Sequence, residues 1–169
     1  IINYLGKVVN YIWGKYFMAN EKKTEALIKQ ILIEKGYTNE NGFLLEEQIS
    51  DNPKIKKLLI NASKSGNGIG KPEFIISNNQ NATIIVVECK ANITLHKTKN
   101  LDSPKNYACD GAIHYASYLS KEYDVIAIGA SGESKKELVI DTYSWIKGDI
   151  LYKDMKLNEI RTMNESTNI

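Results

Sequence analysis

The stretch Ala82-Thr83-Ile84-Ile85-Val86-Val87-Glu88-Cys89-Lys90 decides the fold, because it joins a β-branched apolar run to an acid and a base. Such a run predicts a buried strand, whose successive side chains alternate between the two faces of a sheet. Glu88 and Lys90 are two residues apart, so we expect them on one face and Cys89 in the packing on the other. A second acid, Glu73, follows Pro72 fifteen residues upstream of Glu88. These residues make this end of the strand the first candidate for a catalytic or metal-binding site.

Signals on either side of this strand predict an α/β fold with a central mixed β-sheet flanked by helices. Asn20 is suited to cap a first helix at its N-terminus, the segment Asp51-Asn52-Pro53 to cap a second, and Gly36 to end the first. The polar run 78–81 predicts the turn of a hairpin. The expected helices are 21–35, 53–60 and 104–120, and the expected strands are 43–49, 74–77, 82–91, 124–130 and 137–141. Residues 63–70 and 92–103 are expected to be loops.

The first of these helices carries an acid on its inward face. Glu25, Ile28 and Leu32 share one stripe at helical spacing, where a merely solvated glutamate would be out of place. Glu21, one turn earlier, is the alternative candidate. On the helix 104–120, a second stripe is formed by Ala108, Ala112, Tyr115 and Leu119.

The chain is long enough for one domain, which we assign to residues 20–160. Residues 1–19 have the spacing of an N-terminal amphipathic helix, and 161–169 are interpreted as a tail or linker. Because the chain starts with Ile1 instead of Met, we interpret it as part of a longer protein. No apolar run approaches the length of about 20 residues that a membrane span needs, and no secretory signal is visible. These features predict a cytoplasmic protein with no membrane partner.

The net charge of +2 neither supports nor excludes a nucleic-acid partner, because positive charge can be local. One lysine cluster precedes the first acid and consists of Lys54, Lys56, Lys57, Lys64 and Lys71. A second follows the strand and consists of Lys97, Lys99 and Lys105. Either cluster could contact phosphate groups or be an ordinary solvated surface. The two cysteines, Cys89 and Cys109, are interpreted as reduced, buried thiols.

The ordered set of motifs resembles the PD-(D/E)XK nuclease superfamily. The matching residues are Pro72-Glu73, Glu88-Cys89-Lys90 after a hairpin, a preceding helix with Glu25, and the later Tyr115-Ala116. The approach 68–74 also resembles the Gly-rich segment before the first acid of that family. The resemblance covers roughly residues 24–132, and it is tightest to the N-terminal nuclease domains of type I R subunits and of fused restriction-modification enzymes.

The resemblance implies a Mg²⁺-dependent endonuclease acting on double-stranded DNA, with Mn²⁺ able to substitute. Glu73, Glu88 and the backbone carbonyl of Cys89 would hold the metal, and Glu25 would reach it through water. Lys90 would hold the attacking water or stabilise developing negative charge. The implied DNA contacts are Lys71, Lys97, Lys99, Lys105 and Tyr115. Other domains or subunits would supply sequence recognition, methylation or translocation.

Two positions depart from that pattern. Glu73 stands where the family more often has Asp, which moves the carboxylate by one methylene. Gly111 stands where related enzymes often have Gln, four residues before Tyr115, with Asp110 or His114 as weak substitutes. Tyr115 itself could contact phosphate, brace Lys90 or be a half-buried helix residue.

Other motifs give weaker hypotheses. The segment 66–71 is glycine-rich, but its spacing is wrong for a phosphate-binding loop and it precedes a strand. His96 and His114 lack metal-site spacing with the cysteines, and His96 is expected at the surface of the loop, where it could also meet phosphate. The alternatives to a restriction nuclease are a non-catalytic nucleic-acid-binding domain with the nuclease fold and a resolvase or repair nuclease of the same superfamily.

Overall fold

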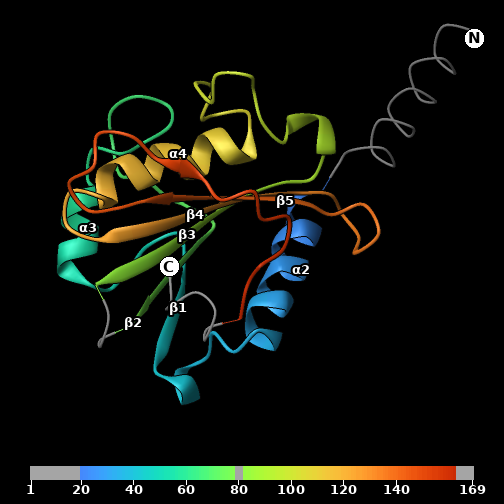
Figure 1. The fold of residues 1–169 in the computed structure, drawn as a ribbon, viewed down its shortest axis with the longest axis horizontal. Coiled ribbons are helices and arrows are strands. Elements are labelled where there is room, and N and C mark those ends of the chain that lie inside the picture. Colours follow the sequence, from blue (N-terminus) through green and yellow to red (C-terminus); the bar gives the residue numbers. More distant parts are fainter. Residues whose placement is uncertain (1–19, 79–81, 163–169) are drawn as a thin grey trace, which may run out of the picture.

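The computed structural model describes residues 20–78 and 82–162, which form a mixed sheet with helices on both faces (Figure 1). The strands are β1 (Phe43–Glu47), β2 (Phe74–Asn78), β3 (Thr83–Lys90), β4 (Asp124–Ser131), β5 (Val139–Trp145) and β6 (Lys153–Asp154). They lie in chain order across the sheet, and only β3 and β4 are parallel. The α/β prediction is confirmed, and the architecture is consistent with a restriction-endonuclease-like core.

Helices cover the two faces of the sheet unequally. Helix α2 (Glu21–Glu34) lies on one face, and α3 (Pro53–Leu59) and α4 (Ala108–Leu119) lie on the other (Figure 1). Helix α4 makes the crossover that two parallel neighbours require. Two short 3₁₀ turns, η1 (Asn39–Asn41) and η2 (Ile93–Leu95), complete the described elements. The amphipathic helix expected over residues 1–19 lies outside the described residues, as does part of the predicted tail.

Strand β3 separates two apolar cores because its side chains alternate. Ile84 and Val86 pack with α3 and α4, whereas Ile85, Val87 and Cys89 pack with α2. Cys89 is fully buried in the second core, as predicted, and both cysteines are free thiols. The alternation therefore directs Glu88, the acid of β3, toward α4.

The capping predictions are also confirmed. The Asn20 side chain accepts a hydrogen bond from the backbone N–H of Lys22 at 3.0 Å, and Asn52 caps α3 by bonding Lys54 N–H at 2.9 Å. Gly36 follows α2 with φ of 96°, a left-handed conformation that glycine adopts without strain. These caps fix where α2 and α3 begin, and α2 begins beside the end of β3.

Two element predictions were wrong in extent, and one strand was missed. Helix α4 begins at Ala108, not 104, because residues 104–106 form a turn in which Asn106 and Tyr107 donate to the Ser103 carbonyl. Strand β5 runs over 139–145, not 137–141, and the short edge strand β6 was not predicted. No helix within the described ranges is long and apolar enough to cross a membrane.

Candidate active site

The antiparallel register of β2 and β3 brings the two predicted acids together. Phe74 pairs with Val87 and Ile75 with Val86. Extending this register by one step sets Glu73 opposite Glu88, and the charge of Glu73 contributes to the raised pKa of Glu88. Directly opposite residues in such a pair have Cβ atoms about 4.5–5.5 Å apart. Two carboxylates thus converge where β2 begins and β3 ends.

Glu88 is fully buried, which is costly for a carboxylate. Its Oε2 atom pairs with the Lys64 ammonium at 2.5 Å, but Oε1 is buried without a hydrogen-bond partner among the described residues. Burial raises the pKa of Glu88 to about 7, although Lys64 opposes the shift. In the part of the chain that the structure describes, the site therefore contains a carboxylate oxygen without a hydrogen-bond partner, on a group whose pKa lies near neutral pH.

Lys90 lies next to the same acids but also reaches α2. Its ammonium bonds Glu21 Oε1 at 2.5 Å. Burial lowers the pKa of Lys90, but the hydrogen bond and charge of Glu21 outweigh it, so the pKa lies above its usual value. Lys90 is consequently a charged donor at neutral pH.

A cleft of about 720 Å³ opens beside these residues. Its lining combines acids and lysines from α2, β3 and the segment before β2: Asn20, Glu21, Lys22, Glu25, Gln48, Glu73, Lys90, Ala91, Asn92 and Leu95. The Glu25 side chain is only 13% exposed and bonds Lys22 at 2.5 Å. Burial and the nearby Glu25 raise the pKa of Glu73. Both helix candidates, Glu21 and Glu25, thus lie in one cleft with Glu73.

The predicted DNA contacts fall into two groups. Lys71, Lys99 and Lys105 are exposed. Lys97 is also exposed, but its ammonium forms an ion pair with Asp141. Tyr115 is buried, not half-buried: it is 1% exposed, and its hydroxyl accepts a hydrogen bond from the Lys71 N–H at 3.2 Å. Tyr115 therefore supports the segment before Glu73 from within the core.

Gly111 occupies the position where enzymes of the PD-(D/E)XK superfamily often have Gln, and the contacts around it explain why glycine is present. A Cβ atom there would lie 3.1 Å from Glu88 Oε2 and 3.0 Å from the Pro104 carbonyl. The two suggested substitutes point elsewhere. The Asp110 carboxylate binds Thr98 and Ser103, and His114 Nε2 lies 3.0 Å from the Ala62 carbonyl. The geometry therefore contradicts both substitutes, and Gly111 leaves room for Glu88.

Three residues of the site were missed by sequence reasoning. Lys64 was one of several loop lysines, and nothing in its sequence context distinguished the one that turns toward Glu88. Lys22 precedes Glu25 by three residues, a spacing that could have predicted their ion pair. Gln48 lines the cleft with φ of 62°, an uncommon value for a residue other than glycine. No local pattern indicated this conformation.

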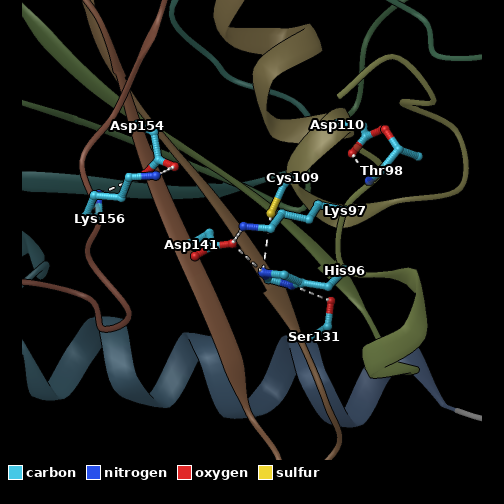
Figure 2. Close-up of polar contacts among 9 residues, drawn as sticks. All are labelled: His96, Lys97, Thr98, Cys109, Asp110, Ser131, Asp141, Asp154 and Lys156. Carbon is cyan, nitrogen blue, oxygen red and sulfur yellow. Dashed lines mark hydrogen bonds and ion pairs between the residues drawn. The ribbon is translucent and has the colours of Figure 1, made fainter. Parts of the chain in front are cut away.

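A second polar cluster joins distant parts of the chain (Figure 2). His96 Nε2 lies 3.4 Å from Cys109 Sγ and 3.2 Å from Asp141 Oδ2. The predicted surface position of His96 was wrong, because the residue is only 7% exposed. Sequence spacing did not indicate that His96 and Cys109 lie together; the loop after β3 brings His96 beside the first turn of α4.

The chain is related to a restriction enzyme. It is 37% identical over 131 residues to the "Type II restriction enzyme and methyltransferase RM.BcgI" of Heyndrickxia coagulans, a match that covers 69% of this chain and 19% of the relative. The chain thus spans about a fifth of the length of this relative. No protein-family model and no solved structure matches the chain.

Proposed function

We propose that this chain is the Mg²⁺-dependent DNA endonuclease domain of a restriction-modification protein, with a PD-(D/E)XK-type site. The observation that carries the proposal is the convergence of Glu73, Glu88 and Lys90 beside one cleft, with Glu88 Oε1 buried and unpartnered. The relationship to a restriction enzyme and methyltransferase supports the same class of function.

The donor set fits a hard divalent cation. Carboxylate and carbonyl oxygens are the ligands that Mg²⁺ prefers, and it keeps several waters. Glu73, Glu88 and the Cys89 carbonyl are the proposed ligands, and Glu25 would bind through water. Bound there, the metal would offset phosphate charge and lower the pKa of a bound water. The unpartnered Glu88 Oε1 is the atom in this structure that such an ion would satisfy.

The lysines of the site have separable roles in this proposal. Lys90 stays charged and would orient the attacking water or stabilise negative charge at the phosphate. Lys64, which is 17% exposed on the segment before β2, pairs with Glu88 Oε2 and so leaves Oε1 for a metal. Lys71, Lys99 and Lys105 remain the proposed contacts to the DNA backbone.

The rest of a restriction-modification reaction would come from outside this chain. The relative is named as both a restriction enzyme and a methyltransferase, and the chain spans about a fifth of it. We propose that additional domains or subunits supply sequence recognition and methylation, while this domain cleaves double-stranded DNA.

The test is cleavage of supercoiled plasmid by the chain with Mg²⁺, Mn²⁺ or EDTA. We expect metal-dependent nicking that Lys90→Ala reduces at least about 100-fold, the scale of losing one positioned charge-stabilising group. Lys135→Ala, a surface lysine paired with Glu34 of α2, is the matched control and should cleave like wild type.

Mn²⁺ titration provides a second readout that does not need cleavage. We expect Glu88→Gln to weaken Mn²⁺ binding, whereas Glu34→Gln on the exposed face of α2 should not. If wild type neither nicks DNA nor binds Mn²⁺ more tightly than Glu88→Gln, the nuclease proposal is wrong and a non-catalytic domain with this fold is favoured.

A further inference from the structure

We propose that His96, Cys109 and Asp141 form a zinc site separate from the proposed magnesium site. The three come from different parts of the fold: His96 ends η2, Cys109 lies in the first turn of α4, and Asp141 is on β5 (Figure 2). Their ligand atoms all lie within 4.8 Å of one another. This inference does not depend on the proposed nuclease activity.

The spacing of the ligand atoms fits a tetrahedral ion. Zinc bonds of about 2.3 Å to sulfur and 2.0–2.2 Å to nitrogen or oxygen place tetrahedral ligands about 3.4–3.6 Å apart. The observed separations from His96 Nε2 are 3.4 Å to Cys109 Sγ and 3.2 Å to Asp141 Oδ2. Cys109 Sγ and an Asp141 carboxylate oxygen lie within 4.8 Å of each other, so side-chain rotation can bring all three atoms to one ion, and water would take the fourth position.

The donor types select zinc over magnesium. A thiolate and an imidazole suit Zn²⁺, whereas Mg²⁺ requires oxygen ligands. The thiolate and the Asp141 carboxylate would together balance the two charges of the ion. The paired acids near Glu88 have the opposite preference, so the two sites are chemically distinguishable.

The orientation of His96 argues against a nucleophilic triad. In such a triad the thiol and the acid bond to different ring nitrogens. Here Cys109 and Asp141 both face Nε2, while Nδ1 lies 3.0 Å from the hydroxyl of the fully buried Ser131. A hydrogen bond from Nδ1–H to Ser131 leaves the Nε2 lone pair free for a metal. Histidine ligands are usually held in place by such a hydrogen bond from the ring nitrogen that does not bind the metal.

The backbone holds this arrangement in place. The Cys109 N–H donates to the His96 carbonyl at 2.9 Å, which joins the loop to the first turn of α4. Cys109 also packs against β4, because a Cβ atom on Gly129 would lie 2.7 Å from the Cys109 backbone nitrogen. A zinc ion would add β5 to this junction and fix the start of α4, the helix whose Gly111 leaves room for Glu88.

One competing cation is present in the structure. The Lys97 ammonium pairs with Asp141 Oδ2, the oxygen proposed to bind zinc. Its side chain is 45% exposed, so it can leave toward solvent. Lys97→Met should therefore bind zinc at least as tightly as wild type.

The test is Co²⁺ titration of chelator-treated protein, with zinc competition and excess Mg²⁺ present throughout. We expect one equivalent of Co²⁺ to give the near-ultraviolet absorption of a thiolate–cobalt bond, and zinc to abolish it. Cys109→Ser should lose the band, and Cys89→Ala, which removes the other thiol, should keep it. Far-ultraviolet circular dichroism checks that each variant is folded.

Asp141→Asn tests a second ligand in case Cys109→Ser does not fold. Asp141 is 25% exposed and the change is nearly isosteric, so this variant should fold normally. We expect it to weaken Co²⁺ binding tenfold or more. No thiolate band in wild type, a band that survives Cys109→Ser, or unchanged affinity in Asp141→Asn would each overturn the proposal.

Discussion

At the scale of single residues, the buried Glu88 carboxyl group links stability to pH. Its pKa is raised from 4.5 to about 7 in the folded chain, mainly by burial. Between these pH values the folded state binds a proton that the unfolded state has lost, so the free energy of unfolding falls as pH rises from about 4.5 to 7. Glu88→Gln removes this dependence.

We therefore expect Glu88→Gln to gain stability relative to wild type between pH 5 and pH 8, by at most about 3 kcal/mol. The measurement is urea denaturation in EDTA, so that bound metal does not contribute. Glu34→Gln, on the exposed face of α2, is the control. If the difference in free energy of unfolding between wild type and Glu88→Gln does not change with pH, Glu88 is not protonated in the folded state.

Gly111 gives a second prediction at this scale. Gly111→Ala places a Cβ atom 3.1 Å from Glu88 Oε2, so the carboxylate must shift. The better helix propensity of alanine, about 1 kcal/mol, offsets part of the crowding. We expect Mn²⁺ affinity to fall about tenfold or more while the free energy of unfolding changes by about 1 kcal/mol or less.

Isothermal titration with Mn²⁺ and urea denaturation check these two quantities separately. Ser117→Ala, on the same helix, is the control for a general effect of substitution in α4. Unchanged Mn²⁺ affinity in Gly111→Ala would mean that the space at Gly111 does not serve the carboxylate.

The sequence predicted the residues of the site where local geometry was sufficient. Strand alternation alone placed Glu88 and Lys90 on one face, and helical spacing placed Glu25 inward. Lys64 and His96 could not be predicted, because each is directed by contacts with residues more than twenty positions away. Long-range packing, not local pattern, decides those side chains.

At the scale of elements, Asp110 holds the loop after β3 onto α4. Its carboxylate accepts hydrogen bonds from the Thr98 N–H at 3.0 Å, the Thr98 hydroxyl at 2.5 Å and the Ser103 N–H at 2.9 Å. The residue is 1% exposed, so its loss would leave these donors in a poorly hydrated place. We expect Asp110→Ala to cost about 2–4 kcal/mol.

Urea denaturation measures this cost, with the exposed Asp102→Ala in the same loop as control. Hydrogen exchange should show faster exchange of the Thr98 and Ser103 amides in Asp110→Ala. Equal free energies of unfolding for Asp110→Ala and Asp102→Ala would show that the hydrogen bonds to Asp110 are not needed to hold the loop.

The same hydrogen bonds between Asp110 and the loop explain why the start of α4 was predicted too early. Residues 104–107 have no pattern that opposes a helix, but Asp110 draws the preceding loop back across the first turn. The helix consequently begins only at Ala108. In contrast, the extent of α2 followed from Asn20 and Gly36, whose effects are local. Element boundaries were predictable where caps set them and not where tertiary contacts did.

At the scale of the whole molecule, the sequence predicted the fold class but not the strand order. Apolar runs and a hairpin turn indicate which strands exist. The parallel pairing of β3 with β4, and the unpredicted β6 at the edge, depend on how α4 crosses the sheet. A two-residue strand such as β6 has too short a pattern to be recognised.

The distribution of charge over the whole chain predicts that DNA binding requires metal. The net charge is only +2, and four acids converge at the cleft: Glu21, Glu25, Glu73 and the buried Glu88. Lys22, Lys64 and Lys90 pair with three of these acids, so the cluster keeps only a small net negative charge. Without a metal cation this remaining charge repels a phosphate backbone, although the exposed Lys71, Lys99 and Lys105 attract it. Ca²⁺, which also takes oxygen ligands, should remove the repulsion.

We expect Ca²⁺ to tighten binding of a labelled duplex by about tenfold, which corresponds to about 1.4 kcal/mol of relieved repulsion. The double variant Glu73→Gln, Glu88→Gln should bind more tightly than wild type in EDTA and respond little to Ca²⁺, because two acids of the cluster and two metal ligands are gone while the lysines remain. Fluorescence anisotropy at fixed ionic strength measures both effects. Glu34→Gln controls for the loss of any one acid, and an equal Ca²⁺ response in the double variant would place the metal effect outside this cleft.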